Sequence, residues 1–155
     1  MANFVPAHPG FADRVRESFA RQGAMRLIGA KLVRIEPGAV DIGLGHRDDL
    51  TQQHGYIHAG VLSAIADTAG GYAGFTLFPA EASVLTVEYK INLLAPGDGE
   101  SFVAEGRVIK PGRTLCIVRG EVYAIRGERR SLCALMQQTL MVMHGKSDQP
   151  STSIQ

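Results

Sequence analysis

The sequence of 155 residues is poor in the residues that mark disulfide-bonded, zinc-binding and redox proteins. Its two cysteines, Cys116 and Cys133, fall in apolar, strand-like segments and lack the close spacing of a zinc or redox motif. We therefore expect both to be reduced residues of the core. Tryptophan is also absent, which excludes no class of protein.

An excess of charge of one sign is missing as well. Sixteen basic and fifteen acidic side chains nearly cancel, and no basic stripe alternates with aromatic residues. Proteins that neutralise a nucleic-acid backbone carry such a stripe, so we expect no nucleic-acid partner. The N-terminus has no basic stretch followed by a long apolar run, and it therefore resembles neither a signal peptide nor a membrane anchor. By default, we expect a cytoplasmic location.

The composition that remains is that of an ordinary folded protein, with 45% apolar and 20% charged residues. The length suits one domain, and no internal repeat is visible. We expect this domain to cover residues 25–144. An N-terminal segment with a short helix, residues 1–24, precedes it. A polar tail, residues 145–155, follows it and is expected to be disordered.

Hydrophobic periodicity predicts the elements of this domain. Residues 8–23 have an apolar stripe at helical spacing, and Gly23 can end this helix. From residue 27 the apolar residues alternate with polar ones on both sides of a Pro37-Gly38 turn, which predicts a hairpin. The polar residues 47–58 predict a loop. Four further strands are predicted at about 85–93, 101–110, 114–126 and 132–144.

Residues 59–78 are almost wholly apolar or small on more than one helical face, which is typical of a buried helix. Four glycines, a central aspartate and the closing Pro79 argue against a membrane span. Six strands and one buried helix predict an α+β fold in which a curved antiparallel sheet wraps the helix. This is the hotdog arrangement.

The only charged side chain between Ala59 and Ala80 is Asp67. Burying an ionised carboxylate costs several kcal/mol unless it is paired, so we interpret Asp67 as functional. The alternative is a structural acid satisfied by backbone amides or by the side chain of a partner. Free amides of the first helical turn could stabilise an oxyanion, but Asp67 lies about two turns further along. A groove shared with a second subunit could bring the two together.

Two segments resemble the signature of the PaaI-like hotdog acyl-CoA thioesterases. Residues 52–60 read Gln-Gln-His-Gly-Tyr-Ile-His-Ala-Gly, and residues 66–69 read Ala-Asp-Thr-Ala. The strand over residues 86–97 and the Gly112-Arg113 turn resemble further parts of the family, so the likeness covers roughly residues 25–143.

The resemblance implies a role for each matching residue. Asp67 would be the base or nucleophile, and Ala59 and Gly60 would supply the backbone donor to the thioester oxygen. The amide of Gln52 would help to hold water or substrate, and the hydroxyl of Thr86 would position the attacking water. The resemblance also implies a homodimer or homotetramer, with acyl-CoA as the substrate and no cofactor beyond the CoA that this substrate carries.

Two residues depart from the family pattern. Ala59 stands where the family has the middle glycine of His-Gly-Gly, which is harmless unless that residue must adopt positive φ. Gln52 stands in place of the commoner asparagine, and its longer side chain could shift the water. Strict alternation along the strand places Thr86 with Glu88 and Lys90, and does not tell which face meets the cleft.

The histidines of the loop have two interpretations. His58 opens the predicted helix and can cap it or hydrogen-bond the loop, or it can act directly in catalysis. His54 and His58 are four positions apart, but Gly55 and the loop setting argue against a two-histidine metal site. We expect no metal.

Cations at a cleft mouth commonly bind phosphates, which makes Lys90, Lys110, Arg113 and Arg119 candidates for the CoA phosphates. Solvated strand faces explain such residues equally well. Arg113 is the strongest of the four because the Pro-Gly turn would hold it at a strand end.

The favoured function is hydrolysis of an acyl-CoA thioester, with the choice between base and nucleophile left open for Asp67. One alternative is a non-catalytic acyl-CoA-binding hotdog protein, against which the retention of Asp67 argues. Another is an enoyl-thioester hydratase or dehydratase. Hotdog enzymes of that kind resemble one another in a pair of Asp and His at the helix start, which this chain lacks.

Overall fold

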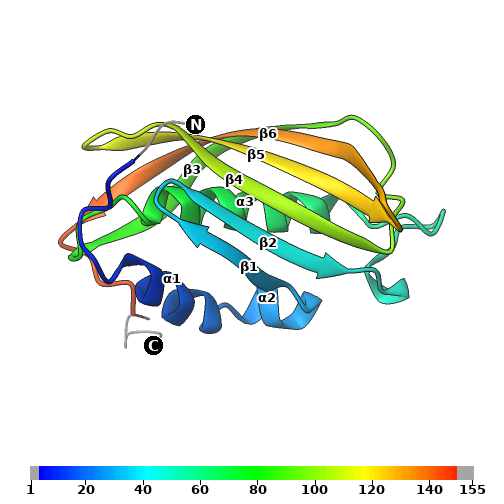
Figure 1. Ribbon diagram of the computed structural model, residues 1–155, viewed down its shortest axis with the longest axis horizontal. Helices are drawn as coiled ribbons and strands as arrows, with labels where there is room; N and C mark the ends of the chain where they lie inside the picture. The colour runs from blue at the N-terminus through cyan, green and yellow to red at the C-terminus, as the bar shows by residue number, and fades with distance from the viewer. Residues whose placement is uncertain (1–3, 150–155) are drawn as a thin grey trace, which may run out of the picture.

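A curved sheet wrapped around one long helix dominates the computed structural model, which describes residues 4–149 (Figure 1). The sheet has six strands in the order β1-β2-β4-β5-β6-β3, and all neighbours are antiparallel. The α+β hotdog prediction is therefore confirmed. The elements are α1 (Phe11–Ala20), α2 (Gly23–Ile28), β1 (Lys31–Glu36), β2 (Ala39–Gly45), the 3-10 helix η1 (Asp48–Leu50), α3 (Ala59–Phe75), β3 (Ala82–Leu93), β4 (Ser101–Lys110), β5 (Leu115–Arg126) and β6 (Arg129–His144).

Helix α3 is the centre of the core, as its apolar residues on every side require. Ile65, Ala69 and Phe75 have no exposed surface, and the helix contacts β2, β3, β4, β5 and β6. Strand β4 comes close because it has a glycine at the crossing. A Cβ on Gly106 would lie 2.2 Å from the carbonyl oxygen of Ala69. Backbone contact therefore fixes where α3 lies on the sheet.

Helix α1 packs against the C-terminal end of α3. Val15 is fully buried in the common core. The guanidinium of Arg14 donates hydrogen bonds to the carbonyl oxygens of Phe75 at 2.8 Å and Pro79 at 2.6 Å. Phe75 is the last residue of α3, where carbonyls lack partners inside the helix, and Pro79 lies just beyond it. Since Arg14 supplies these partners, side chains of α1 are fixed beside α3.

The prediction of a single leading helix that ends at Gly23 is wrong. Helix α1 stops at Ala20, and Gln22 has an extended backbone with ψ of 102°. Gly23 then begins the short helix α2, which ends at Gly29 with φ of 76°. A glycine can open a helix as well as end one, and here the left-handed conformation that favours glycine lies six residues later.

The predicted hairpin, loop and buried cysteines agree with the structure. Gly38 adopts φ of 75° in the turn of the β1–β2 hairpin. The polar segment 47–58 contains η1 and an isolated bridge between Thr51 and Ile57. Cys116 and Cys133 are buried and free, as predicted.

Strand β3 lies at one edge of the sheet and contains a bulge between Thr86 and Glu88. Before the bulge, Thr86 pairs with the buried Leu140. After it, Tyr89 pairs with the buried Gln138. Paired residues lie on the same face of the sheet. The residues of β3 that face α3 are therefore even-numbered before the bulge and odd-numbered after it. The grouping of Thr86 with Glu88 and Lys90, predicted from strict alternation, is therefore wrong.

The start of the predicted tail is described up to residue 149. Asp148 there forms an ion pair with Arg21, which follows α1. Residues 150–155, the rest of that prediction, lie outside the described residues. Within residues 4–149, no helix is both long and apolar enough to cross a membrane.

Candidate active site

Asp67 lines a groove of about 690 Å³ between α1, α3 and β3. The side chain lies on the face of α3 that meets β3 and is partly buried. Other residues of the groove come from α1, α3, β3 and the segment that follows β6, and among them are Arg21, Gly71, Tyr72, Thr86 and Asp148. The lone acid predicted from the sequence is therefore accessible from a groove rather than sealed in the core.

One oxygen of the Asp67 carboxylate is held by two side chains. Oδ1 accepts hydrogen bonds from Oγ1 of Thr86 at 2.8 Å and from Nε2 of Gln138 at 2.5 Å. Burial raises the pKa of Asp67, whereas these two hydrogen bonds lower it, and the net shift is upward. Within residues 4–149, no donor is hydrogen-bonded to Oδ2. That oxygen is free to accept a proton or to attack an electrophile.

Gln138 is the site residue that the sequence reasoning missed. It lies on β6 in a row of helix-facing residues, between Met136 and Leu140, and its exposed fraction is 1%. A signal for it does exist in the sequence, because a glutamine interrupts an otherwise apolar alternating row. The partner of that glutamine, 71 positions away along the chain, is not encoded by the row.

The loop before α3 forms a second groove, of about 490 Å³, which Gln52, Tyr56 and Ala59 line. The backbone of Gln52 closes a tight turn, in which its N–H donates to Tyr56 at 2.8 Å and its carbonyl accepts from Gly55 at 2.9 Å. Gly55 has φ of 82°, which favours glycine. The side-chain Oε1 of Gln52 accepts from the backbone N–H of His54. This leaves the Nε2 group as its available donor.

The two predicted amide donors in the first turn of α3 differ in whether their N–H groups are already hydrogen-bonded. His58 is the N-cap, and its Nδ1 accepts from the N–H of Gly60 at 2.9 Å. This confirms the capping interpretation of His58 and means that the Gly60 amide is already engaged. Within residues 4–149, no acceptor is bonded to the N–H of Ala59. Ala59 is helical rather than left-handed, so its substitution for glycine brings no strain.

The structure thus brings the predicted residues together in two groups. Asp67 and Thr86 share one groove, while Gln52 and Ala59 share the other. Asp67 lies eight positions after Ala59 along the helix, which is about 12 Å at 1.5 Å per residue. Within a single chain, the carboxylate of Asp67 and the N–H of Ala59 therefore do not meet.

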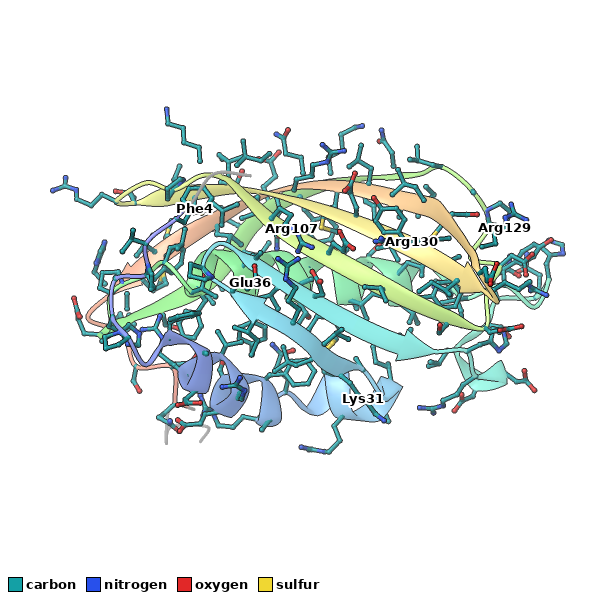
Figure 2. The ribbon with its side chains drawn as sticks, viewed as in Figure 1. Phe4, Lys31, Glu36, Arg107, Arg129 and Arg130 are labelled. Carbon is teal, nitrogen blue, oxygen red and sulfur yellow. The ribbon has the colours of Figure 1, made fainter. Side chains whose placement is uncertain are left out.

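The predicted phosphate-binding cations lie away from both grooves. Lys90, Lys110 and Arg113 line neither the Asp67 groove nor the Gln52 groove, and their binding of CoA phosphates stays a prediction. Arg126 and Arg129 line a smaller hollow that shares Tyr56, Ala95 and Pro96 with the Gln52 groove. Figure 2 shows Arg129 at the end of the sheet beside this loop.

Comparisons with known proteins identify similarity to thioesterases and esterases. Residues 54–130 match the model of the Thioesterase superfamily. A crystal structure of a thioesterase family protein from Silicibacter pomeroyi is 46% identical, with a TM-score of 0.86, and the match covers 88% of this chain and 100% of that one. A Saccharolobus solfataricus protein named "Putative esterase" is 33% identical over 122 residues, which is 79% of each chain. The Escherichia coli PaaI protein has the same fold, with a TM-score of 0.78 at 17% identity over 87% of this chain and 94% of that chain.

Proposed function

Since this chain belongs to the thioesterase superfamily, we propose that it hydrolyses acyl-CoA thioesters and that Asp67 drives the attack on the thioester carbonyl. The observation that carries this proposal is the asymmetry of the carboxylate. Thr86 and Gln138 hold Oδ1, whereas Oδ2 has no hydrogen-bond partner within residues 4–149 and the side chain lines the groove. The protein thus holds one oxygen of the carboxylate and leaves the other without a partner in the described part of the chain, on a groove that a substrate can enter.

Two routes use this open oxygen. As a base, Oδ2 takes a proton from water while the water oxygen bonds to the carbonyl carbon, and the carbon–sulfur bond then breaks as the thiolate of CoA takes up a proton. As a nucleophile, Oδ2 itself bonds to that carbon, CoA leaves, and water hydrolyses the resulting anhydride. Both routes need an ionised Asp67. Because the hydroxyl of Thr86 donates a hydrogen bond to Asp67, its role in this proposal is to hold the carboxylate.

The carbonyl oxygen needs a donor as negative charge develops on it. The N–H of Ala59 at the start of α3 suits this role because it has no acceptor within residues 4–149 and lies at the positive end of the helix dipole. The Nε2 group of Gln52 lies on the same groove and can hold the oxyanion or the water. Since Asp67 of the same chain is about 12 Å away, these donors serve the Asp67 of a second copy.

The free edge of β3 supports such a second copy. This strand of 12 residues exposes its backbone along one side, together with Leu85, Tyr89 and Leu93. Long apolar edge strands are prone to pair with another strand. We therefore propose a homodimer, or a tetramer built from such dimers, in which the site lies between subunits. Light scattering should give at least twice the 16.6 kDa mass of one chain, and an active monomer would contradict a shared site.

We propose that Arg126 and Arg129, rather than Lys90, Lys110 and Arg113, bind the CoA phosphates. Their hollow continues the Gln52 groove, where the CoA end of the thioester would emerge if Ala59 binds the carbonyl. Arg126 pairs with Asp98 across this hollow, and Arg129 donates to Ser131 at 3.0 Å.

A turnover assay that detects free thiol tests the proposal on a panel of aliphatic and aromatic acyl-CoA substrates. Asp67→Asn should abolish turnover of the best substrate while Asp13→Asn, a change in the exposed carboxylate that pairs with Arg16, leaves it unchanged. Binding without turnover by the wild type would favour an acyl-CoA-binding protein. Addition of water to an enoyl-CoA without release of thiol would favour a hydratase.

A further inference from the structure

Strand β6 places one amide in the apolar layer that covers α3. Met136 and Leu140 on either side of Gln138 are equally buried and belong to the core. A third apolar side chain at position 138 would suit such a layer without any need for hydrogen-bond partners. The presence of glutamine there requires an explanation in terms of what its amide does.

The amide nitrogen of Gln138 lies at the junction of three acceptors. Nε2 lies 2.5 Å from Oδ1 of Asp67, 3.0 Å from the backbone oxygen of Asp67 and 3.1 Å from Oγ1 of Thr86. The other end of the amide is different, since Oε1 is buried and has no partner within residues 4–149. All the hydrogen bonding of this side chain is therefore directed at Asp67 and at the hydroxyl that also holds Asp67.

Helix α3 leaves room for this amide through a glycine. A Cβ on Gly70 would lie 1.9 Å from Oε1 of Gln138, whereas a Cβ on the neighbouring Gly71 would meet nothing within 4 Å. Glycine weakens a helix interior, so its presence at position 70 fits a need for space. The close fit fixes the amide against one oxygen of Asp67.

We propose that Gln138 is a positioning residue, whose buried amide holds Oδ1 of Asp67 so that Oδ2 faces the groove in its ionised form. The expected effect of Gln138 on turnover rests on the proposed function. The expected effect of Gln138 on the pKa of Asp67 is independent of that function. Other charged or titratable groups on this groove are Arg21, Tyr72 and Asp148. The pKa of Asp67 is nevertheless set by burial, which raises it, and by the hydrogen bonds of Thr86 and Gln138, which lower it.

The test compares Gln138→Met, which keeps the volume and removes the donor, with Gln137→Met on the exposed face of the same strand. Loss of the donor should raise the pKa of Asp67, measured from its side-chain ¹³C resonance, and should move the acid limb of the kcat/KM profile to higher pH. It should also lower kcat about tenfold at neutral pH. Gln137→Met should change none of these quantities.

A second variant removes the contact without removing Gln138. In Gly70→Ala the new methyl group must displace the flexible amide, so the pKa of Asp67 should rise in the same direction as in Gln138→Met. A folded Gln138→Met protein with an unchanged Asp67 pKa and an unchanged acid limb would overturn the inference. If the wild type cleaved no thioester, the carboxyl resonance would still decide the role of Gln138, and only the proposed function would fail.

Discussion

The two halves of the site are built in different ways. Asp67 is fixed by side chains from β3 and β6, so three elements that lie far apart in the sequence must come together to define one carboxylate. The donors at the helix start are fixed mainly by neighbours, since Gln52 bonds to His54 and Tyr56, and His58 bonds to Gly60. Tertiary packing therefore sets the position of the carboxylate, whereas a local turn sets the position of the proposed oxyanion donors.

The largest effect should follow from Asp67→Asn, which keeps the shape and removes the charge. Both routes need the carboxylate, so kcat should fall by on the order of 10²-fold or more. Near-normal kcat in a folded variant would show that the carboxylate of Asp67 has no catalytic role.

The same variant should be at least as stable as the wild type at neutral pH. Burial raises the pKa of Asp67 above its ordinary value, so the folded state binds this proton more tightly than the unfolded state. Wild-type stability should therefore decline as pH rises from the ordinary aspartate range through the raised pKa, and Asp67→Asn should escape this decline. Thermal unfolding at several pH values measures it, and a gap between the two proteins that narrows as pH rises would contradict the sign.

A smaller loss should follow from changes in the locally built half. Gln52→Ala should lower kcat by about ten- to a hundredfold with little loss of stability, because one hydrogen bond made in the transition state is worth about 1.5–3 kcal/mol. Gln53→Ala, a change in the exposed neighbour, is the matched control. Equal activity in both variants would show that Gln52 only closes its turn.

The effect on CoA binding should be smaller again. Arg129→Ala should raise KM by about three- to tenfold with little change in kcat, since an exposed cation adds modest binding energy to a phosphate. Arg130→Ala is the control, because Arg130 pairs with Glu105 and stacks on Tyr123 instead. A rise in KM for the substitution of Lys90 or Arg113, and none for Arg129, would move the phosphate site.

The smallest effect concerns the helix cap. His58→Ala should cost about 1 kcal/mol of stability, and His58→Asn should restore most of it, because asparagine also accepts from the first-turn amides. Denaturant unfolding measures both. If His58→Ala and His58→Asn were equally active and equally stable, the side-chain cap at position 58 would contribute nothing to the start of α3.

What the sequence predicts well follows the same division. Asp67 stands out because it is the one acid in an apolar helix, and the turn around Gly55 is a local pattern. Thr86 faces Asp67, but the bulge that follows places Glu88 and Lys90 on the other face, and strict alternation does not encode a bulge. Gln138 depends on the pairing of distant strands, and so does the distance of Lys110 from either groove.

The most direct test of a site shared between subunits is complementation between two impaired chains. Asp67→Asn and Gln52→Ala chains are coexpressed with different tags, and the mixed dimer is purified through both tags. In a shared site, one of its two sites regains an intact Asp67 and an intact Gln52, so the mixed dimer should have about half of the wild-type kcat per dimer. A mixed dimer no more active than its two parents would place both residues in one chain's site and contradict the account.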